Sequence, residues 1–455
     1  MATGLGATRS SMEGGNLSAR EKPNAESAFA VHSARSRIMA EAHARPFVPI
    51  DTPRRILHFA FMMDHWSLLK DRAAFEAFCR TRSCPPPAPE AKHHRIDLSP
   101  ASLRWEHHGE FATYTWEFPT RTAIGEDILD VAFRPGPDEL SHLMFLLPQP
   151  GPLLVTVDLH ILPDSVVDEA IQSVFGPTQL AACEVEGGAA RIATDFHPDV
   201  YGFVRILISD RNLTPPQAGA LVQRVLEIET YRTLALLGLP EAQDLGPSIR
   251  RIETELPLLM SEMRESRGIE ANNHLLDRLT ALAAELEAGA AYSLFRFGAT
   301  RAYHEIIGQR LVAIGEQPVP GLPSFSAFLA RRLSPAIRTC ITTEARQETL
   351  SRKLSRAAQL LRTRVEIALE SQNSDLLRKM NNRARMQLQL QRTVEGLSIA
   401  AITYYISAIA HLLFEGAHKP FDWLDPGLAT AAIVPLVLVF VTWTVIRIRK
   451  KHTDE

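Results

Sequence analysis

Two long apolar stretches without a formal charge lie near the C-terminal end of the chain. They run from Gly396 to Phe414 and from Gly427 to Ile446. Each is close to the roughly 20 residues that a helix needs to cross the hydrocarbon core of a bilayer. A short segment with Pro and Gly residues separates them. We therefore predict a transmembrane hairpin over residues 395–447, with spans at 396–414 and 427–446.

Basic residues border both stretches on the side away from this short segment. No acid lies among the first group, and the second group follows the second stretch directly. The two groups are Arg378, Lys379, Arg383, Arg385 and Arg392, and Arg447, Arg449, Lys450 and Lys451. Positively charged flanks stay in the cytoplasm. We therefore predict cytoplasmic N- and C-termini, an outer loop over 415–426 and a basic cytoplasmic tail over 448–455.

One face of the first stretch carries only small or polar residues. Gly396, Ala400, Thr403, Ser407 and His411 are separated by 4, 3, 4 and 4 positions, which places them on one side of a helix. Small residues let two membrane helices approach closely, and hydroxyl groups can bond across the contact. Polar groups can instead line water or an ion path. These five residues therefore form either a helix-packing face or the lining of a pore.

A basic segment without Pro or Gly precedes the first stretch, and we predict a long stalk helix over 344–394. Its apolar residues recur at spacings of three and four, which is typical of a coiled coil. They are Leu350, Leu354, Ala357, Leu361, Val365 and Ala368, followed by Gln372, Leu376 and Met380. The partners of this stripe are either other helices of the same chain or the same helix in neighbouring subunits. We expect a homo-oligomer.

The charge of the chain argues against a nucleic-acid partner. The formal net charge is −3, and only the stalk region from 344 to 392 is basic, with 11 basic and 5 acidic residues. This local excess fits contact with anionic lipid next to the membrane. The four cysteines contain no CxxC pair, which favours a reduced cytosolic compartment over a zinc site.

The N-terminal half shows an α+β pattern. Residues 1–30 have no apolar run and read as a disordered leader, residues 31–240 as an α+β domain, and residues 241–343 as a helical region. Strands are predicted at RILHFAFMM, PLLVTVDLHIL, ARIATDF and YGFVRILIS, with a hairpin at SLRWEHHGEFATYTWEF and a helix from Pro215 to Gly238. Hairpins with helices between them favour an α+β layer structure over a doubly wound nucleotide fold.

This domain shows little recognisable chemistry. Four histidines and two glutamates lie close in sequence: His93, His94, His107, His108, Glu106 and Glu110. We expect the histidines in turns and loops rather than around a metal. Asp158 and His160 share a strand face but have no evident nucleophile to serve. No phosphate loop and no hydrolase or metalloprotease motif is present, so we predict no catalytic residue, cofactor or metal.

The segment EAHARPF, from Glu41 to Phe47, resembles the N-E-V-H-A-R-P-F signature of a bacterial family of uncharacterised membrane-anchored proteins. Further matches are ETYRTLALLGLP, FRFGATRAYHEI, RRLSPAIRTC, LLRTRVEIALESQNSDLL and LQLQRTVEGLSIAAITYY. The resemblance implies a location in the bacterial inner membrane and no specific activity. Within the signature, His43 and Arg45 either contact an anionic ligand or partner, or Arg45 forms a buried pair with a carboxylate.

The layout of a cytoplasmic domain, a long stalk helix and two C-terminal spans is similar to the CorA-like magnesium channels. Those channels carry Gly-Met-Asn after the first span, where this chain has LLFEGAHKP. The sequence thus favours a membrane-anchored oligomer whose cytoplasmic domain is a binding or regulatory module. The alternative is a CorA-like ion channel or transporter without that filter, and a membrane-tethered enzyme comes third.

Overall fold

The computed structural model describes residues 32–35, 38, 47–89, 91–120, 132–133, 144–164, 171–175, 180–418 and 425–453. The leader over 1–30 and the signature residues His43 and Arg45 lie outside this part of the chain. The chain divides into two compact units. The first contains the residues up to Pro247 together with Gly289–Arg346, and the second contains Ser248–Ala288 together with the residues from Gln347 on.

The first unit is built on a mixed β-sheet, whose described part has nine strands in the order β2-β3-β4-β1-β5-β8-β7-β6-β9. Strands β5 and β8 pair in parallel, and the other neighbours pair antiparallel. The strands are β1 (Arg54–Met62), β2 (His93–Leu98), β3 (Ala101–His107), β4 (Phe111–Pro119), β5 (Leu153–Pro163), β6 (Ala181–Val185), β7 (Ala190–Thr194), β8 (Val204–Asp210) and β9 (Gln317–Pro318).

The predicted hairpin is confirmed as β3 and β4, with Leu103 opposite Trp116 and Trp105 opposite Tyr114. The strands expected around β1, β5, β7 and β8 are also present. The expectation that His93 and His94 lie in loops is wrong, because both begin β2. Successive side chains of β2 alternate in burial, since Ile96 is buried and Asp97 is exposed. This alternation is typical of a strand with one buried face.

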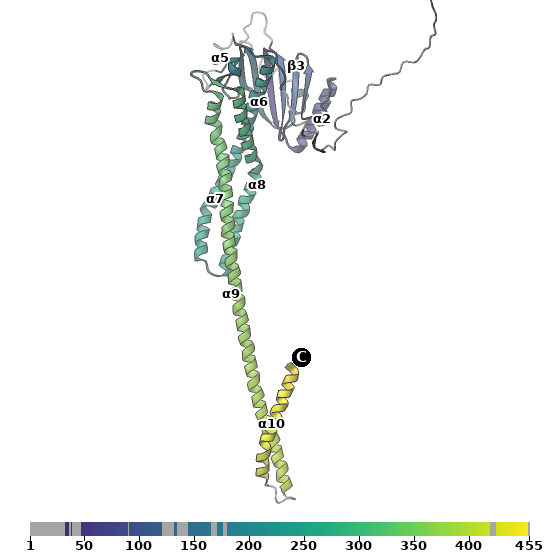
Figure 1. The fold of residues 1–455 in the computed structure, drawn as a ribbon, viewed down its shortest axis with the longest axis vertical. Coiled ribbons are helices and arrows are strands. Elements are labelled where there is room, and N and C mark those ends of the chain that lie inside the picture. The colour runs from purple at the N-terminus through teal and green to yellow at the C-terminus, as the bar shows by residue number, and fades with distance from the viewer. Residues whose placement is uncertain are drawn as a thin grey trace, which may run out of the picture. The chain divides into compact units, whose positions relative to one another are not determined.

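Helices cover both faces of this sheet (Figure 1). On one face lies α6 (Pro215–Leu236), together with residues of the unit from α8 and α9, and Ile56, Leu159 and Ile206 pack there. On the other face α2 (His65–Thr81) packs Phe75 against Trp105, with ring centroids 4.8 Å apart. The unit also contains three short helical elements, which are α5 (Ile171–Phe175), η2 (Met144–Leu146) and η4 (Glu186–Gly188).

Three long helices follow α6 and contribute residues to both units. They are α7 (Gly238–Glu265), α8 (Ile269–Ile314) and α9 (Phe325–His418). The predicted stalk is part of α9, which begins at Phe325 rather than near 344 and continues without interruption into the first apolar stretch. Pro335 lies inside this helix. The chain has no Gly or further Pro between Phe325 and Glu395 that would end it.

In the second unit, α7, α8 and α9 are joined by polar contacts along buried leucine faces. Ser248 Oγ donates to Glu285 Oε1 over 2.7 Å, and Arg364 Nη1 donates to the Met263 carbonyl over 2.5 Å. The buried apolar side chains of these helices in the unit are Ile249, Ile252, Leu256, Leu259, Met263, Leu275, Leu279, Leu282, Leu286, Leu350, Leu354, Ala357 and Leu361. For residues 350–361, the partners of the apolar stripe are therefore helices of the same chain.

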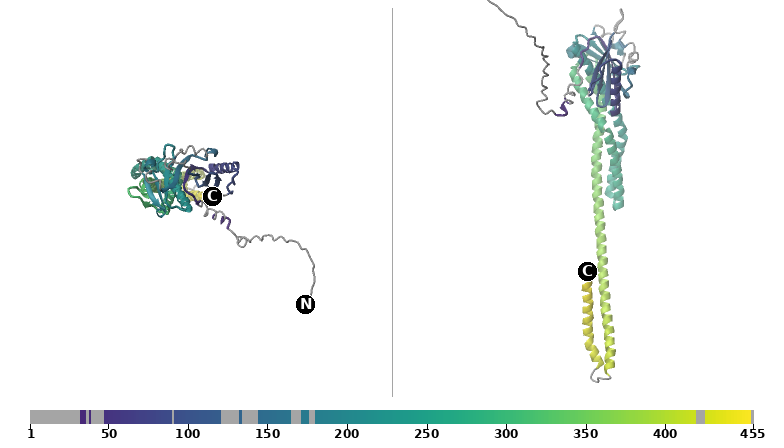
Figure 2. Two further views of the ribbon diagram at one scale, coloured as in Figure 1. Left: turned by 90° about the horizontal axis from the view of Figure 1, so that it is seen from above. Right: turned by 90° about the vertical axis from the view of Figure 1, so that its right-hand side faces the viewer.

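Beyond this bundle α9 changes character, since every residue from 371 to 394 is exposed. The last helix, α10 (Pro426–Thr453), runs antiparallel beside the end of α9 (Figure 2). His411 Nδ1 and Thr430 Oγ1 are 2.9 Å apart across this contact. Two helices are thus long and apolar enough to cross a membrane, by length and composition: α10 and the C-terminal part of α9.

Candidate functional site

A small cleft lies between α6 and one half of the sheet. Its volume is about 20 Å³, close to that of one water molecule. Its walls come from β1, β3, β4 and α6 and are mostly polar: His58, Arg104, Glu106, His108, Phe111, Thr113, Gln223, Leu226, Glu227, Thr230 and Tyr231. A small, partly buried space lined by charged groups is a candidate for binding a polar ligand.

Strand alternation makes this half of the sheet polar on the α6 side. In β3 and β4, Trp105 and Tyr114 point toward α2, so their sequence neighbours point the other way. The residues facing the α6 side are Arg95, Asp97, Ser102, Arg104, Glu106, Thr113, Thr115 and Glu117. Across the strands, His58 is opposite Thr115, Thr115 opposite Arg104, and Arg104 opposite Arg95. We refer to these four residues as the cross-strand row.

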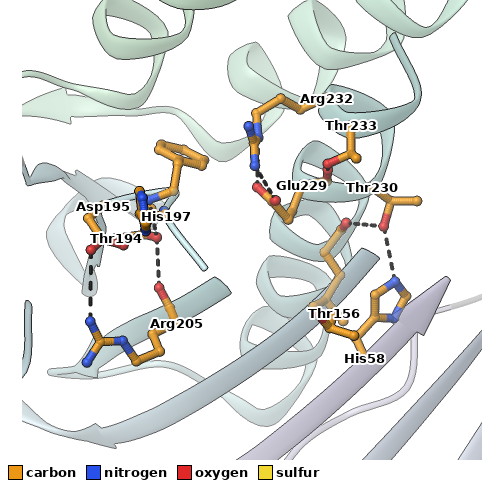
Figure 3. Close-up of polar contacts among 12 residues, drawn as sticks. His58, Thr156, Thr194, Asp195, His197, Arg205, Glu229, Thr230, Arg232 and Thr233 are labelled. Carbon is orange, nitrogen blue, oxygen red and sulfur yellow. Dashed lines mark hydrogen bonds and ion pairs between the residues drawn. The ribbon is translucent and has the colours of Figure 1, made fainter. Parts of the chain in front are cut away.

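His58 closes the inner end of the row and ties the sheet to α6 (Figure 3). Its Nδ1 lies 2.8 Å from Thr115 Oγ1 and its Nε2 lies 3.0 Å from Thr230 Oγ1. Because the Thr230 hydroxyl donates its proton to the Leu226 carbonyl, Nε2 must donate to Thr230 and Nδ1 must accept from Thr115. Burial and the nearby Arg104 lower the pKa of His58 to about 3, so the ring is neutral.

The two arginines of the row differ in how their guanidinium groups are used. Arg95 donates to Glu117 Oε2 over 3.2 Å and to Ser102 Oγ over 3.1 Å. Arg104 has one ionic neighbour, Glu106, at 3.8 Å, and its guanidinium donates no hydrogen bond to any described residue. Its side chain is nevertheless only 11% exposed. The row therefore contains a largely buried cation, Arg104, whose Nε has no hydrogen-bond acceptor among the described residues.

Beside the cleft, Glu110 fastens α8 to the turn between β3 and β4. The two terminal nitrogens of Arg296 donate to its carboxylate over 3.1 and 2.7 Å, and the Tyr303 hydroxyl donates over 2.5 Å. Burial, followed by the hydrogen bond to Glu110, raises the pKa of Tyr303. With three donors on its carboxylate, Glu110 has a structural role.

Asp71 of α2 has the same role on the opposite face of the sheet. Its buried carboxylate accepts from Trp105 Nε1 at 2.9 Å and from the Tyr114 hydroxyl, and it lies 2.8 Å from His107 Nε2. Burial, reinforced by the charge of Asp71, raises the pKa of Tyr114 well above its usual value. Of the two histidines expected in the turn, His107 is thus the last residue of β3, and only His108 lies beyond it.

Asp158 and His160 share a face of β5, as the alternation predicts, and are 3.5 Å apart. Arg55 donates to both carboxylate oxygens of Asp158, over 3.0 and 2.7 Å. Phe133 donates its backbone N–H to His160 Nε2 over 3.2 Å, and burial, with the charge of Arg55, lowers the pKa of His160 well below its usual value. This arrangement is a buried ion pair capped by a neutral imidazole, with no hydroxyl or thiol bonded to it among the described residues.

Two of the sequence motifs serve packing in the first unit. In ETYRTLALLGLP, Glu229 and Arg232 form an ion pair on α6 (Figure 3). The Arg232 guanidinium also lies over the Phe196 ring, 5.3 Å from its centroid. Gly238 lies near the end of the same motif, and a Cβ there would clash with Thr300 Oγ1 of α8. FRFGATRAYHEI contributes Arg296 and Tyr303 to Glu110. These motifs therefore hold α6 and α8 to the sheet.

The remaining reactive side chains lie apart from one another. Cys79, Cys183 and Cys340 are buried and Cys84 is half-buried, all as free thiols. Burial raises the pKa of Cys79 to about 11 and that of Cys183 to about 12. Within the described part of the chain, no three His, Cys, Asp or Glu side chains gather as ligands for a metal ion.

The five residues of the small and polar face on α9 do not share one environment. Thr403 and Ser407 are buried, with hydroxyls that have no partner among the described residues, and His411 bonds to Thr430 of α10. Gly396 and Ala400 are exposed, and no atom lies within 4 Å of a Cβ placed at Gly396.

Residues 30–452 match the protein family described as "Protein of unknown function (DUF3422)". The chain belongs to this family. No curated protein matches the chain, and no solved structure matches it. The resemblance to CorA-like channels therefore gains no support from these comparisons, and the description of the DUF3422 family includes no activity and no membrane.

Sequence reasoning about this DUF3422 chain did not single out the cross-strand row. The signals were present, since His58 interrupts the apolar strand RILHFAFMM, and polar residues alternate with aromatic ones in LRWEH and FATYTWE. An alternating hairpin ordinarily faces water on its polar side. Only the register, which sets Arg104 beside Arg95 and Thr115, shows that the polar residues converge.

Proposed function

We propose that the protein is a membrane-anchored binding or regulatory module of the bacterial inner membrane. The observation that carries this proposal is the apolar surface of the α9–α10 hairpin. Leu397, Leu412, Leu436 and Phe440 are each more than 60% exposed there. An apolar surface of this kind promotes aggregation in water, whereas in a bilayer it contacts the lipid tails. The basic residues at both inner ends favour a cytoplasmic location for the first unit.

Self-association through α9 is part of the proposal. The exposed segment carries apolar residues at heptad-like spacings: Leu369, Leu376, Met380, Leu390, Val394 and Leu397, with exposures from 45 to 73%. Arg383 and Gln387 occupy intermediate positions of the same pattern. A long single helix gains little stability from its own backbone, so its apolar stripe calls for partner helices. When several subunits insert in the same membrane with the same orientation, their α9 helices run parallel and their apolar stripes can pack against one another.

The geometry favours helix packing over a pore for the small and polar face. Thr403 and Ser407 are 7% and 8% exposed, and His411 is bonded to Thr430 of α10. Residues that line an ion path face water, whereas hydroxyls buried in a contact between two spans support close approach of the helices. An anchor is therefore the function that this hairpin supports best.

Two reporter fusions test the anchor and its orientation. Alkaline phosphatase, which is active only outside the cytoplasm, is inserted after Phe421, and a green fluorescent protein is fused to the C-terminus. We expect both to be active and the full-length chain to stay in the membrane pellet after alkaline carbonate extraction. A chain truncated before Gly396 should instead be extracted. Extraction of the full-length chain would disprove the anchor, and an inactive phosphatase would disprove the orientation.

A further inference from the structure

Two arginines lie directly opposite each other on the polar half of the sheet, where opposite charges would be the stable choice. Arg95 of β2 pairs with Arg104 of β3 in the antiparallel register. Directly opposed residues have Cβ atoms about 4.5–5.5 Å apart, and like charges at this distance destabilise a sheet. The side chains of both arginines are more than two-thirds buried, with exposures of 30% and 11%. Three carboxylates lie near the two arginines: Asp97 and Glu117 are 3.4 and 3.2 Å from Arg95, and Glu106 is 3.8 Å from Arg104.

Nitrogen atoms without an acceptor lie on the same face of the neighbouring strands β2 and β3. Arg104 Nε and Arg95 Nη1 are buried without a hydrogen-bond acceptor in the described structure, and so is His93 Nδ1. His93 is two residues from Arg95 in β2, and it lies opposite Glu106, which is two residues from Arg104 in β3. The side chains of His93, Arg95 and Arg104 therefore lie on the same face of the two strands. Buried donors are almost always satisfied in native proteins. A guanidinium without acceptors therefore indicates a partner that is bound in function.

The nearby carboxylates do not supply that partner, because each already accepts from another group. Glu117 accepts from Arg95 and Ser102, and Glu227 accepts from Arg310 and Gln223. Glu106 lies 3.5 Å from the Thr113 hydroxyl and stays 3.8 Å from Arg104. These acids balance the charge of the two arginines but leave Arg104 Nε without a close acceptor. The missing partner of Arg104 is therefore a hydrogen-bond acceptor, and a charged oxygen atom makes the strongest bond to a guanidinium.

The cleft limits how much of such a partner can enter. With a volume of about 20 Å³, it admits one oxygen-sized group beside Arg104, His58 and Thr113. The rest of the molecule would lie outside the cleft. A carboxylate or a phosphate meets this condition, since either presents small oxygen atoms to the planar fork of a guanidinium.

We propose that Arg104, assisted by Arg95, binds the oxyanion group of a ligand, either a carboxylate or a phosphate, in the cleft between the cross-strand row and α6. This proposal names the ligand class of the binding module proposed above and rests on that function. Membrane extraction and anion binding are separate measurements, so a failure of the anchor can be told apart from a failure of the site.

The test uses the full-length chain purified in detergent. Inorganic phosphate and acetate are titrated against chloride at constant ionic strength, and binding is followed by calorimetry and by the melting temperature from tryptophan fluorescence, which Trp105 and Trp116 report for the first unit. We expect phosphate or acetate to raise the melting temperature beyond the effect of chloride. Preference for phosphate would indicate a phosphorylated ligand, and preference for acetate a carboxylic acid.

Two glutamine variants separate a binding role from a structural one. Arg104→Gln should weaken anion binding by roughly 10- to 100-fold, the value of a charged hydrogen bond. Without the anion it should be about as stable as the wild type, because the 3.8 Å contact with Glu106 is the ion pair of Arg104 that the substitution removes. The matched control is Arg224→Gln on α6, whose guanidinium is already paired with Glu186 at 2.8 Å, and it should leave anion affinity unchanged.

Three results would overturn the proposal. The first is the absence of any effect of phosphate and acetate beyond that of chloride, which would mean that the cleft holds water alone. The second is equal anion affinity in Arg104→Gln and the wild type. The third is a loss of stability of Arg104→Gln in chloride, which would make the arginine structural. If Arg104→Gln fails to fold, Arg95→Gln replaces it and should still weaken binding, by roughly 3- to 10-fold.

Discussion

At the scale of single residues, several polar groups inside the first unit are held by full sets of hydrogen bonds. Glu110 and Asp71 each receive three contacts, and His58 uses both ring nitrogens. Such groups specify where each helix lies on the sheet, because a shifted helix would leave a buried polar atom unsatisfied. Arg104 differs from these groups, because its buried Nε has no acceptor among the described residues and its side chain lines the cleft, which is why we assign it to binding.

His58 makes the first unit sensitive to acid. Its folded pKa of about 3 is below the value of 6.5 for an exposed histidine, so unfolding takes up a proton in between. The contribution of neutral His58 to the free energy of unfolding is therefore fully present above pH 6.5. As the pH falls toward 3, this contribution is lost at roughly 1.4 kcal/mol per pH unit. In urea unfolding at pH 6.5, 5.5 and 4.5, His58→Gln should show a shallower decline than the wild type.

The exposed His197 provides the control, since His197→Gln leaves the buried His58 in place and should keep the decline that His58 causes. His160 also contributes a loss of the same sign in all three proteins, because burial lowers its pKa too. Equal slopes for His58→Gln and the wild type would contradict the neutral, buried ring described for His58.

The sequence allowed the pair of Asp158 and His160 to be placed on one strand face, because side chains alternate with a period of two. It did not reveal Arg55 as their partner, since that contact joins residues 103 positions apart. Arg104 and Arg95 were missed for the same reason. Alternation shows which residues share a face of one strand, but only the register between strands shows which residues meet.

At the scale of elements, α9 has two different environments. Its segment 350–361 is buried by α7 and α8, whereas 371–394 is exposed. Both segments have apolar residues at spacings of three and four, so the pattern alone does not distinguish a partner in the same chain from one in another subunit. Likewise, the short strands β6 and β9 gave too little pattern to predict, while β1 and β5 are long enough to recognise.

A pair of leucine variants tests this division of α9. Leu354 is fully buried, so Leu354→Ala should lower the free energy of unfolding of the second unit by about 2–4 kcal/mol. Leu376 is 52% exposed, so Leu376→Ala should cost little stability but weaken self-association. Denaturant unfolding followed by circular dichroism measures the first effect, and sedimentation velocity in detergent measures the second. A large stability loss at Leu376 without change in subunit number would contradict the assignment.

At the scale of the whole molecule, the C-terminal hairpin is compatible with two functions, a membrane anchor and part of a pore. An anchor needs only length, apolar surface and flanking charge, and these were predictable from residues 395–447. A pore needs particular residues aimed at a path. The sequence left both open, since small and polar residues suit either use, and the burial of Thr403 and Ser407 favours the anchor.

Liposomes containing the full-length protein should therefore stay impermeable to K⁺ and Mg²⁺. Exchange of both spans for an unrelated hairpin of equal length and orientation should preserve membrane retention and anion binding, because neither depends on the identity of Thr403 or Ser407. Flux can be followed with ion-sensitive dyes trapped in the liposomes. Ion flux that is lost in Ser407→Trp would contradict the anchor and establish a conducting path.

The cysteines of this chain have a practical consequence. With pKa values of about 11 and 12, the thiols of Cys79 and Cys183 hold less than about one part in ten thousand of reactive thiolate at pH 7. Cys340 is buried as well, and Cys84 is half-buried. With Cys84 replaced by serine, the protein should therefore react little with maleimide reagents. A single introduced cysteine, with Cys84 replaced by serine, could carry a fluorophore or spin label as a site-specific reporter without removing the three buried thiols.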